Sequence, residues 1–384
     1  MKIVHLCISA FYIDNFSYQE NLLSKYHRKL GHDVTVIASL FSFNKEGKGC
    51  YMEGPSEYVN SDGVKVIRID YKKPFYKINK LFRHYEGLFE KIANEKPDII
   101  FSHNISAADM MILRRYLKLH PNVRLYADNH ADYINSGKNF LSKHILHPII
   151  WRFFAQKIEP YIQKCYGVTP MRCRFLKEVY RISEKKIGFL PMGVDDDSIP
   201  SERDVVRKKI RSELGISDDA ILIISGGKID RLKNIHKLVE AIKSLNNEKI
   251  KLILCGVLTP EMDCLKKEFD DKTDVFYYLG WCDAQRVIDC MVASDIACFP
   301  GTHSTLWEQS VGIGLPAIFN HWNEMEHVNV NGNCFLINGE DVGEIRQAIL
   351  TMTDLSNLSH YRELAKEASK SFLYSEIAKK AIEL

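Results

Sequence analysis

The sequence predicts an α/β protein built from two Rossmann-like domains. Its 384 residues exceed one typical core and suit two domains of about 200 residues each. Short apolar runs alternate with helical patterns along the whole chain, which is typical of βαβ units around parallel sheets. An acidic, Pro-containing stretch, residues 195–200 (DDDSIP), interrupts this alternation near the middle of the chain and is typical of a hinge. Two such domains facing each other would define a cleft.

The first domain is expected to open with a βαβ unit. Residues 2–9 (KIVHLCIS) read as a buried parallel strand, and residues 32–38 (HDVTVIA) read as its partner. Between them, Ser17 and Glu20 match a capping box that would start a helix, and Gly31 is placed to end that helix. Further strands are expected at residues 64–69, 97–102, 123–127, 167–169 and 189–190.

The second domain repeats the alternation and ends in an amphipathic helical tail, residues 358–384. The predicted domains are residues 1–195 with about 366–384, whose helix returns to the first domain, and residues 196–365. Strands are expected at residues 220–225, 249–255, 275–279, 296–299 and 317–319, with helices at residues 234–245 and 284–294 and from Leu306.

Composition excludes several classes of protein. The net charge of +3 lacks the strong basic excess of a nucleic-acid binder. Ten Cys residues occur without a CxxC pair or a zinc-site spacing, which favours a reducing compartment over a disulfide framework. The N-terminal apolar run is too short for a signal peptide, and no apolar stretch is long enough for a spanning helix. We therefore expect a cytoplasmic protein.

Glycine and lysine residues follow the first strand of the second domain, where ligands of open α/β sheets bind. Gly226 and Gly227 would let a ligand approach the backbone, and Lys228 and Lys233 would both reach a diphosphate. The alternative is a tight turn with two surface lysines. Weaker signals of the same kind follow the next two strands, at Cys255-Gly256 and Gly280-Trp281.

Residues 299–318 (FPGTHSTLWEQSVGIGLPAI) hold the most informative candidate. A strand ends at Phe299, a polar loop follows, and Glu308 lies in the first turn of the next helix. One interpretation is that the Glu308 carboxylate only stabilises the helix dipole, by roughly 0.3–1 kcal/mol. The other is that it accepts hydrogen bonds from two ribose hydroxyls.

Together these positions resemble the retaining GT-B glycosyltransferases of family 4. That family follows its nucleotide-binding Glu with a short helix and Gly-x-Pro before a strand, and Glu308, Gly314 and Pro316 match. It places a Gly-Arg loop, with a Lys five residues later, on the donor diphosphate. Gly227-Lys228 and Lys233 match, with Lys in place of Arg, so the bidentate fork is lost.

Two other stretches extend the resemblance to nearly the whole chain. Residues 30–37 (LGHDVTVI) are similar to the Gly-His-x-Val of the family's first domain. Residues 186–195 (KIGFLPMGVD) are similar to its entry into the second domain, with Met192 in place of the usual Asn.

The resemblance implies a transferase that moves a sugar from a nucleotide-diphosphate donor to an acceptor hydroxyl, with retention of anomeric configuration and in surface polysaccharide or glycoconjugate synthesis. It implies no cofactor and no metal, with a UDP-sugar as the default donor and Lys228, Lys233 and His130 as the catalytic groups. The donor would lie against Gly227, Gly280, Trp281, Gly301, Thr302, His303, Ser304, Thr305 and Glu308.

Two departures from the family keep other functions open. The Glu that usually lies eight residues before Glu308 is replaced by Pro300, and the Gly-rich loop after the first strand is absent. A non-catalytic partner subunit of the same fold would tolerate both changes. A nucleotide-sugar epimerase or hydrolase of the same architecture is a further alternative, in which Asp14 and Asp128 would serve as acid and base.

The acceptor is expected to be a glycan or a lipid-linked chain. Two basic, apolar segments of the first domain are candidates for contact with a membrane that carries such an acceptor. Residues 71–85 (YKKPFYKINKLFRHY) contain no acidic residue. They read as a solvated helix face with aromatic stems packed inward or, alternatively, as a contact with anionic lipid at the inner membrane face. Residues 136–157 are also apolar and basic, and their aromatic side chains are expected in the core.

Overall fold

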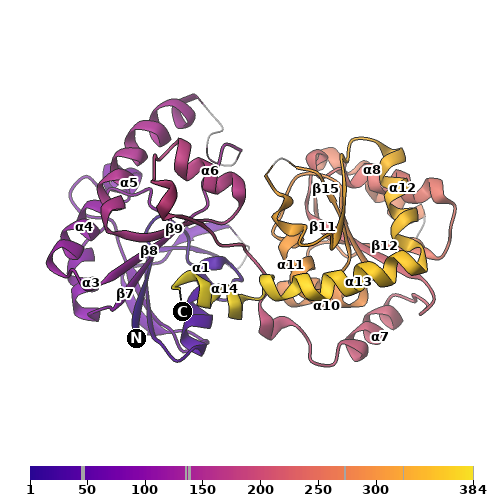
Figure 1. Ribbon diagram of the computed structural model, residues 1–384, viewed down its shortest axis with the longest axis horizontal. Helices are drawn as coiled ribbons and strands as arrows, with labels where there is room; N and C mark the ends of the chain where they lie inside the picture. Colours follow the sequence, from indigo (N-terminus) through magenta and orange to yellow (C-terminus); the bar gives the residue numbers. More distant parts are fainter. Residues whose placement is uncertain (45–47, 135, 137–139, 272–273, 323, 384) are drawn as a thin grey trace. The chain divides into compact units, whose positions relative to one another are not determined.

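The chain folds into two compact units of α/β structure. The computed structural model describes residues 1–44, 48–134, 136, 140–271, 274–322 and 324–383. Unit 1 comprises Met1–Pro191 and Ile377–Leu384, and unit 2 comprises Met192–Glu376. The sequence placed the linker boundary at 195/196 and the return of the tail near residue 366. Figure 1 shows both units with their sheets and helices.

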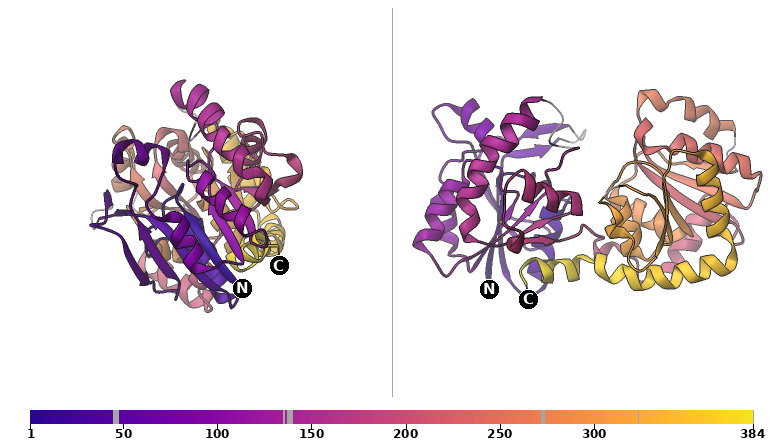
Figure 2. Two further views of the ribbon diagram at one scale, coloured as in Figure 1. Left: turned by 90° about the vertical axis from the view of Figure 1, so that its left-hand side faces the viewer. Right: turned by 45° about the horizontal axis from the view of Figure 1, so that its top comes forward.

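Unit 1 has an eight-stranded sheet in the order β10-β9-β8-β7-β1-β2-β6-β5. Its strands are parallel except β5, which is antiparallel to β6, and helices cover both faces (Figure 2, left). The strands are β1 Lys2–Cys7, β2 Asp33–Ser39, β5 Ser56–Val59, β6 Lys65–Ile69, β7 Ile99–His103, β8 Arg124–Asn129, β9 Ile162–Gly167 and β10 Ile187–Phe189, with a separate hairpin of β3 Phe41–Phe43 and β4 Gly49–Tyr51.

Side chains alternate between the two faces of β1, which divides the core of unit 1. Val4 and Leu6 point into the larger apolar cluster, against α3, α4 and α5, whereas His5 lies on the opposite face. The helices are α1 Gln19–Lys29, α2 Tyr76–Phe82, α3 Leu88–Glu95, α4 Met110–Leu119, α5 Arg152–Ile158 and α6 Pro170–Glu178, and a π-helix at Ser142–Trp151 runs into α5.

Unit 2 has a six-stranded, fully parallel sheet in the order β13-β12-β11-β14-β15-β16. Its strands are β11 Ile221–Ile229, β12 Ile250–Leu258, β13 Phe276–Tyr278, β14 Ile296–Phe299, β15 Ala317–Asn320 and β16 Cys334–Ile337. Its helices are α7 Arg203–Glu213, α8 Ile235–Leu245, α9 Cys264–Asp271, α10 Ala284–Ala293, α11 Leu306–Ile313, α12 Val342–Thr353 and α13 Leu355–Ser369. The last helix, α14 Tyr374–Ala381, begins in unit 2 and continues into unit 1. This order is that of a doubly wound dinucleotide-binding sheet, and the α/β prediction is confirmed.

Two of three local predictions in unit 1 were wrong. Ser17 does not cap α1, because the helix begins after Tyr18 and has no side-chain cap. The strand expected at residues 167–169 lies at 162–167 instead, since Thr169 accepts a hydrogen bond from the Arg172 amide and caps α6. The Gly31 prediction is confirmed, because Gly31 follows α1 with a φ of 84°.

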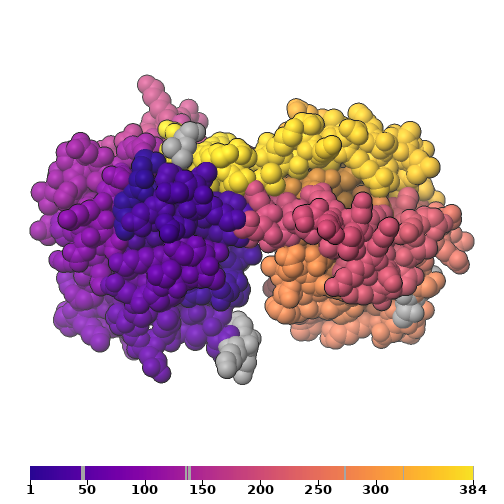
Figure 3. Space-filling model, turned by 90° about the horizontal axis from the view of Figure 1, so that it is seen from below, coloured from indigo at the N-terminus to yellow at the C-terminus, as the bar shows by residue number. Residues whose placement is uncertain are grey.

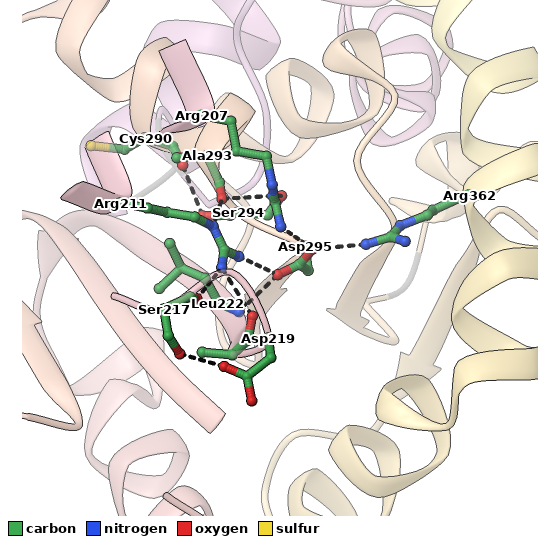
Figure 4. Close-up of polar contacts among 11 residues, drawn as sticks. Arg207, Arg211, Ser217, Asp219, Leu222, Cys290, Ala293, Ser294, Asp295 and Arg362 are labelled. Atoms are coloured by element: carbon green, nitrogen blue, oxygen red, sulfur yellow. Dashed lines mark hydrogen bonds and ion pairs between the residues drawn. The ribbon is translucent and has the colours of Figure 1, made fainter. Parts of the chain in front are cut away.

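A buried carboxylate holds unit 2 together at the amino end of β14. Asp295 is 4% exposed and bonds to side chains from α7 and α13 (Figure 4). Its Oδ2 accepts from Arg211 at 2.6 Å and from the Leu222 amide at 2.9 Å, and its Oδ1 accepts from Arg207 at 2.8 Å and Arg362 at 2.7 Å. In Figure 3, α13 lies in yellow along the surface of unit 2.

The two basic segments of unit 1 only partly follow expectation. Tyr71 and Tyr85 are buried and stacked, with ring centroids 4.6 Å apart, but Phe75, Ile78 and Leu81 are exposed. In the second segment Trp151 is buried, whereas Phe140 and Phe153 are exposed, so the prediction that its aromatic residues pack in the core was wrong for those two. Residues 137–139 lie outside the described residues. No helix among the described residues has the length and apolar content to cross a membrane.

Candidate functional site

The candidate site of unit 2 lies where the direction of chain winding reverses. β11 pairs with β12 on one side and β14 on the other, so the connections leave the sheet in opposite directions from its centre. Ligands of open α/β sheets bind outside the carboxyl ends of the strands at this point. The sequence singled out residues near both of these strand ends, from Gly226 to Lys233 at β11 and from Gly301 to Glu308 after β14.

The paired glycines of β11 accommodate a neighbouring strand rather than a ligand. β11 continues to Ile229, and Gly226 and Gly227 pair with Cys255 and Gly256 of β12. A Cβ on Gly226 would lie 2.0 Å from the Cys255 carbonyl oxygen. The prediction of a loop after residue 225 was therefore wrong. Gly227, with a φ of 99°, does face the loop before α11, because a Cβ there would lie 3.9 Å from Ser304 Oγ.

The loop of residues 301–305 is held by the chain segment that follows β11. A Cβ on Gly301 would lie 2.3 Å from the Leu232 carbonyl oxygen, so only glycine fits between the two backbones. The Thr302 amide also donates to that carbonyl at 3.0 Å. The close neighbour of Gly301 is therefore Leu232-Lys233.

Lys233 fixes the same loop with its side chain. Its ammonium donates to the carbonyl oxygens of Thr302 and His303, at 2.7 and 2.8 Å. Burial lowers the pKa of Lys233 to about 8, against an opposing effect of Asp230. An ammonium has three donors, so one N–H remains for a ligand beside the loop.

Glu308 is the most deeply buried charged group of the site. Its side chain, on α11, is 0% exposed. Its Oε1 accepts hydrogen bonds from His303 Nε2 at 2.7 Å and from His327 Nε2 at 2.9 Å. Burial alone would raise the pKa of Glu308, but the two imidazoles hold it well below its ordinary value. Glu308 is therefore ionised at neutral pH and fixed through one oxygen.

The second oxygen of Glu308 has no partner within the described residues. Oε2 is buried and accepts no hydrogen bond, which is unfavourable for an isolated carboxylate oxygen. The more exposed of the two imidazoles is His303, at 11% against 3% for His327. Of the two imidazoles that hold the carboxylate, His303 is therefore the nearer to solvent.

His327 was missed by sequence reasoning. It lies in a short 3-10 helix, Glu326–Val328, in the connection after β15, and nothing near it in the sequence resembles a ligand loop. Its Nε2, His303 Nε2 and a Glu308 oxygen lie within 4.8 Å of one another. Two imidazole nitrogens and a carboxylate form a zinc-type donor set, but hydrogen bonds join the three groups here.

The other predicted residues of unit 2 lie at the same edge of the sheet. Lys228 is exposed near the end of β11. Gly280 follows β13 with a φ of 66°, and its carbonyl accepts from the Gly256 amide at 2.7 Å. Trp281 is 75% exposed. Ser304 Oγ accepts from the Leu306 amide at 3.2 Å and shapes the turn into α11, while Thr305 is exposed at the helix start.

His130 belongs to unit 1 and follows β8. Its Nε2 lies 3.5 Å from Asp128 Oδ2, and its amide donates to Asn104 Oδ1 at 2.8 Å. Burial alone would lower the pKa of His130, but the Asp128 carboxylate raises it above its ordinary value. His130 can therefore carry a proton near neutral pH.

Comparisons with known proteins agree with this architecture. Residues 21–198 match Glycosyltransferase Family 4, and residues 206–371 match Glycosyl transferases group 1. A glycosyltransferase from Rickettsia africae ESF-5 is similar in structure, with a TM-score of 0.68 and 18% identity over 100% of this chain and 97% of that one. HepE from Anabaena, in complex with UDP, has a TM-score of 0.66 and 14% identity over 100% of this chain and 99% of its own.

WaaG, a glycosyltransferase involved in lipopolysaccharide biosynthesis, has a TM-score of 0.62 and 15% identity over 99% of this chain and 98% of its own. Identities of this size show a shared fold alone. The search of curated proteins gives no sequence match.

Proposed function

Because the chain belongs to the GT-B glycosyltransferases of family 4, we propose that it transfers a sugar from a nucleotide-diphosphate donor to an acceptor hydroxyl. The donor is a UDP-sugar, the anomeric configuration is retained, and the product is a surface polysaccharide or glycoconjugate made in the cytoplasm. The HepE structures solved with UDP and with UDP-glucose support this choice of donor.

The unpartnered Oε2 of Glu308 is the observation that carries the proposal. A buried carboxylate that is fixed through one oxygen and open at the other suits the vicinal hydroxyls of a ribose. The two imidazoles keep it ionised, so it accepts hydrogen bonds at neutral pH. Donor binding turns the His303 side chain aside and replaces its hydrogen bond with those from the ribose.

The lysines at the end of β11 suit the diphosphate. Lys228 is exposed, and its side-chain ammonium has no ion pair or hydrogen bond among the described residues. Lys233 presents its remaining N–H beside the loop of residues 301–305, whose amides add further donors. These groups stabilise the negative charge that develops as the bond between sugar and phosphate breaks. No metal is required in this proposal, and His130 assists the departure of the diphosphate as a proton carrier.

Turnover experiments separate this proposal from its alternatives. Purified protein is screened by thermal shift against nucleotides and nucleotide sugars, since a ligand at a hundred times its Kd stabilises by about 2.7 kcal/mol. The stabilising donor is then incubated with and without candidate glycan acceptors. Glycosylated acceptor is the expected product. Nucleotide release with an altered or free sugar in the absence of acceptor would favour an epimerase or hydrolase. Absence of turnover with every donor would favour a non-catalytic subunit.

A lipid-linked acceptor at the inner membrane face fits the surface of unit 1. Phe75 and Leu81, at 73% and 62% exposure, bracket Ile78 on one apolar face in a segment without acidic residues. The π-helix that follows residue 141 adds Ile145 and Ile149 as exposed side chains. The two segments are in contact, since the rings of Phe82 and Trp151 are 6.4 Å apart.

Apolar side chains surrounded by lysines suit an anionic bilayer surface. Sedimentation with vesicles that contain phosphatidylglycerol tests this contact. The Phe75→Ser/Leu81→Ser variant should lose vesicle binding, whereas Leu119→Ser, on an equally exposed residue of α4, should keep it. Equal binding by both variants would contradict the contact.

A further inference from the structure

A row of buried polar rings crosses unit 1 between α14 and the end of β8. His27 of α1, His5 of β1 and His103 of β7 are each 0% exposed. His27 Nε2 lies 2.8 Å from the Ala378 carbonyl oxygen, and His27 Nδ1 lies 2.9 Å from His5 Nε2. His5 Nδ1 lies 3.0 Å from His103 Nε2, and His103 Nδ1 lies 2.8 Å from Asp128 Oδ2. The row is therefore continuous through both nitrogens of every ring.

The two ends of this row determine how many protons it holds. The Ala378 carbonyl can only accept a hydrogen bond, and so can an ionised Asp128. Four hydrogen bonds join the two ends, and each needs one proton. Three neutral imidazoles supply three protons. If every hydrogen bond is made, the row holds one proton more than three neutral rings carry.

The position of the extra proton follows from charge. All four hydrogen bonds can be made with the extra proton on any one of the three rings, but among these rings only His103 contacts the Asp128 carboxylate. Asp128 is kept ionised because its Oδ1 also accepts from the Asn104 amide at 2.9 Å. Burial lowers the pKa of His5 well below its ordinary value and that of His27 to about 4. The carboxylate therefore favours His103 as the charged ring.

We propose that His27, His5 and His103 form a buried relay that carries one extra proton, located on His103, as the counter-charge of Asp128. His27 and His5 are then neutral with their protons on Nε2, so each donates toward α14. The relay lets Asp128 remain ionised although it is 0% exposed. It also couples the charge of Asp128 to the packing of residues 377–383 against α1, because the Ala378 carbonyl is the terminal acceptor.

The relay has a role in catalysis that rests on the proposed function. Asp128 Oδ2 lies 3.5 Å from His130 Nε2, so a fixed carboxylate orients that ring and favours its protonated form. The three relay histidines are thus positioning residues for His130. The charged groups that influence His130 besides Asp128 are Glu20 on α1, which raises its pKa, and Arg172 on α6, which lowers it. Next to His27 lies His32, with ring centroids 6.4 Å apart.

Nitrogen NMR of the full-length protein tests the proton count directly. Protein labelled with ¹⁵N-histidine is examined at neutral pH by long-range proton–nitrogen correlation, with resonances assigned through single His variants. His103 should show two protonated nitrogens, and His5 and His27 should each show one, at Nε2. A wild-type spectrum in which all three rings are neutral would overturn the proposal. Because the protons are counted in the wild-type spectrum, the result does not depend on whether a variant retains the native number of protons.

The isosteric Asp128→Asn variant tests the cause. Its amide can donate to His103 Nδ1, so three protons then complete the four hydrogen bonds and His103 becomes neutral. His147 serves as an internal reference, because its only described hydrogen bond is to Tyr180, at 2.8 Å, and its spectrum should not change. A doubly protonated His103 in Asp128→Asn would contradict the assignment of its proton to the carboxylate.

Activity gives an independent readout of the positioning role. The His103→Asn variant should lower kcat by about 10–100-fold, which is the effect of removing the groups that orient metal-ligating histidines, with little change in the KM of the donor. Equal kcat values for this variant and the wild type would refute the positioning role. If the wild type transfers no sugar but the three rings together carry four nitrogen-bound protons, the proposed function fails and the relay is still supported.

Discussion

Removal of the Asp295 carboxylate should destabilise unit 2 more than loss of any surface ion pair. Asp295 bonds to three arginines and one backbone amide (Figure 4). Among its partners Arg211 is 1% exposed and donates three further hydrogen bonds to backbone carbonyls. In Asp295→Ala this guanidinium stays buried without its counter-charge. Breaking a buried pair in this way costs about 3–5 kcal/mol.

Two further variants show whether burial causes the effect. Arg362 bonds to the same carboxylate but is 51% exposed, so Arg362→Ala should cost less than about 1 kcal/mol. Asp219 pairs with Lys249 at the surface, at 2.9 Å, and Asp219→Ala should leave the stability nearly unchanged. The expected order of destabilisation is therefore Asp295→Ala, Arg362→Ala and Asp219→Ala.

Urea unfolding monitored by tryptophan fluorescence measures these differences. The chain has 4 Trp residues, and a Trp151→Phe background leaves only those of unit 2. Trp307 is buried there and stacks on Phe319, with ring centroids 4.7 Å apart, so its emission reports the unfolding of this unit. A loss of less than about 1 kcal/mol in Asp295→Ala would refute the reasoning, because an unpaired buried charge could not then be present.

Three further predictions concern the candidate site. The pKa of Lys233 in the folded protein is about 8, below its ordinary value, so the affinity for UDP should fall as the pH rises through 8. The Lys233→Arg variant should remove this fall, because its guanidinium stays charged. The same dependence of UDP affinity on pH in the variant and the wild type would count against the role of the Lys233 charge. Gly301→Ala should lower the free energy of unfolding of unit 2 by about 1–3 kcal/mol through overpacking. Gly54→Ala, where a Cβ meets nothing within 4 Å, should leave stability unchanged. The midpoints of urea unfolding of the two variants test this difference. His327→Ala should raise the pKa of Glu308, because one hydrogen bond to its carboxylate is lost. Carbon NMR titration of the carboxylate measures this pKa, with the exposed Glu326 as reference. An unchanged pKa of Glu308 would exclude the His327 hydrogen bond.

The arrangement of strands could be predicted because buried parallel strands read as apolar runs. Residues 296–299 were placed correctly from such a run, and Gly314, with a φ of 81°, ends α11 as its position indicated. Residues 162–167 were missed because Gln163 and Lys164 interrupt the apolar pattern. Thr169, which was taken for the end of that strand, is a helix cap.

The candidate site could be predicted only where function and local sequence coincide. Glu308 and the loop before it follow a strand directly, so strand-end reasoning found them. His327 reaches Glu308 from a different connection of the sheet, and the rings of His5 and His27 meet only through tertiary packing. Glycine was a misleading signal at Gly301, because it permits the approach of another part of the chain. Sequence spacing alone does not distinguish that neighbour from a ligand.

Calorimetric titration of UDP into the wild type, Glu308→Gln and Glu326→Gln tests the central claim most directly. Glu308→Gln keeps the size of the buried side chain but removes the charge that would accept the ribose hydroxyls. Because a hydrogen bond to a charged group contributes about 1.5–3 kcal/mol, its Kd for UDP should rise at least about tenfold. Glu326 is exposed and pairs with His321, so Glu326→Gln should bind UDP as the wild type does. Equal UDP affinity in Glu308→Gln and the wild type would contradict the assignment of Glu308 to the ribose.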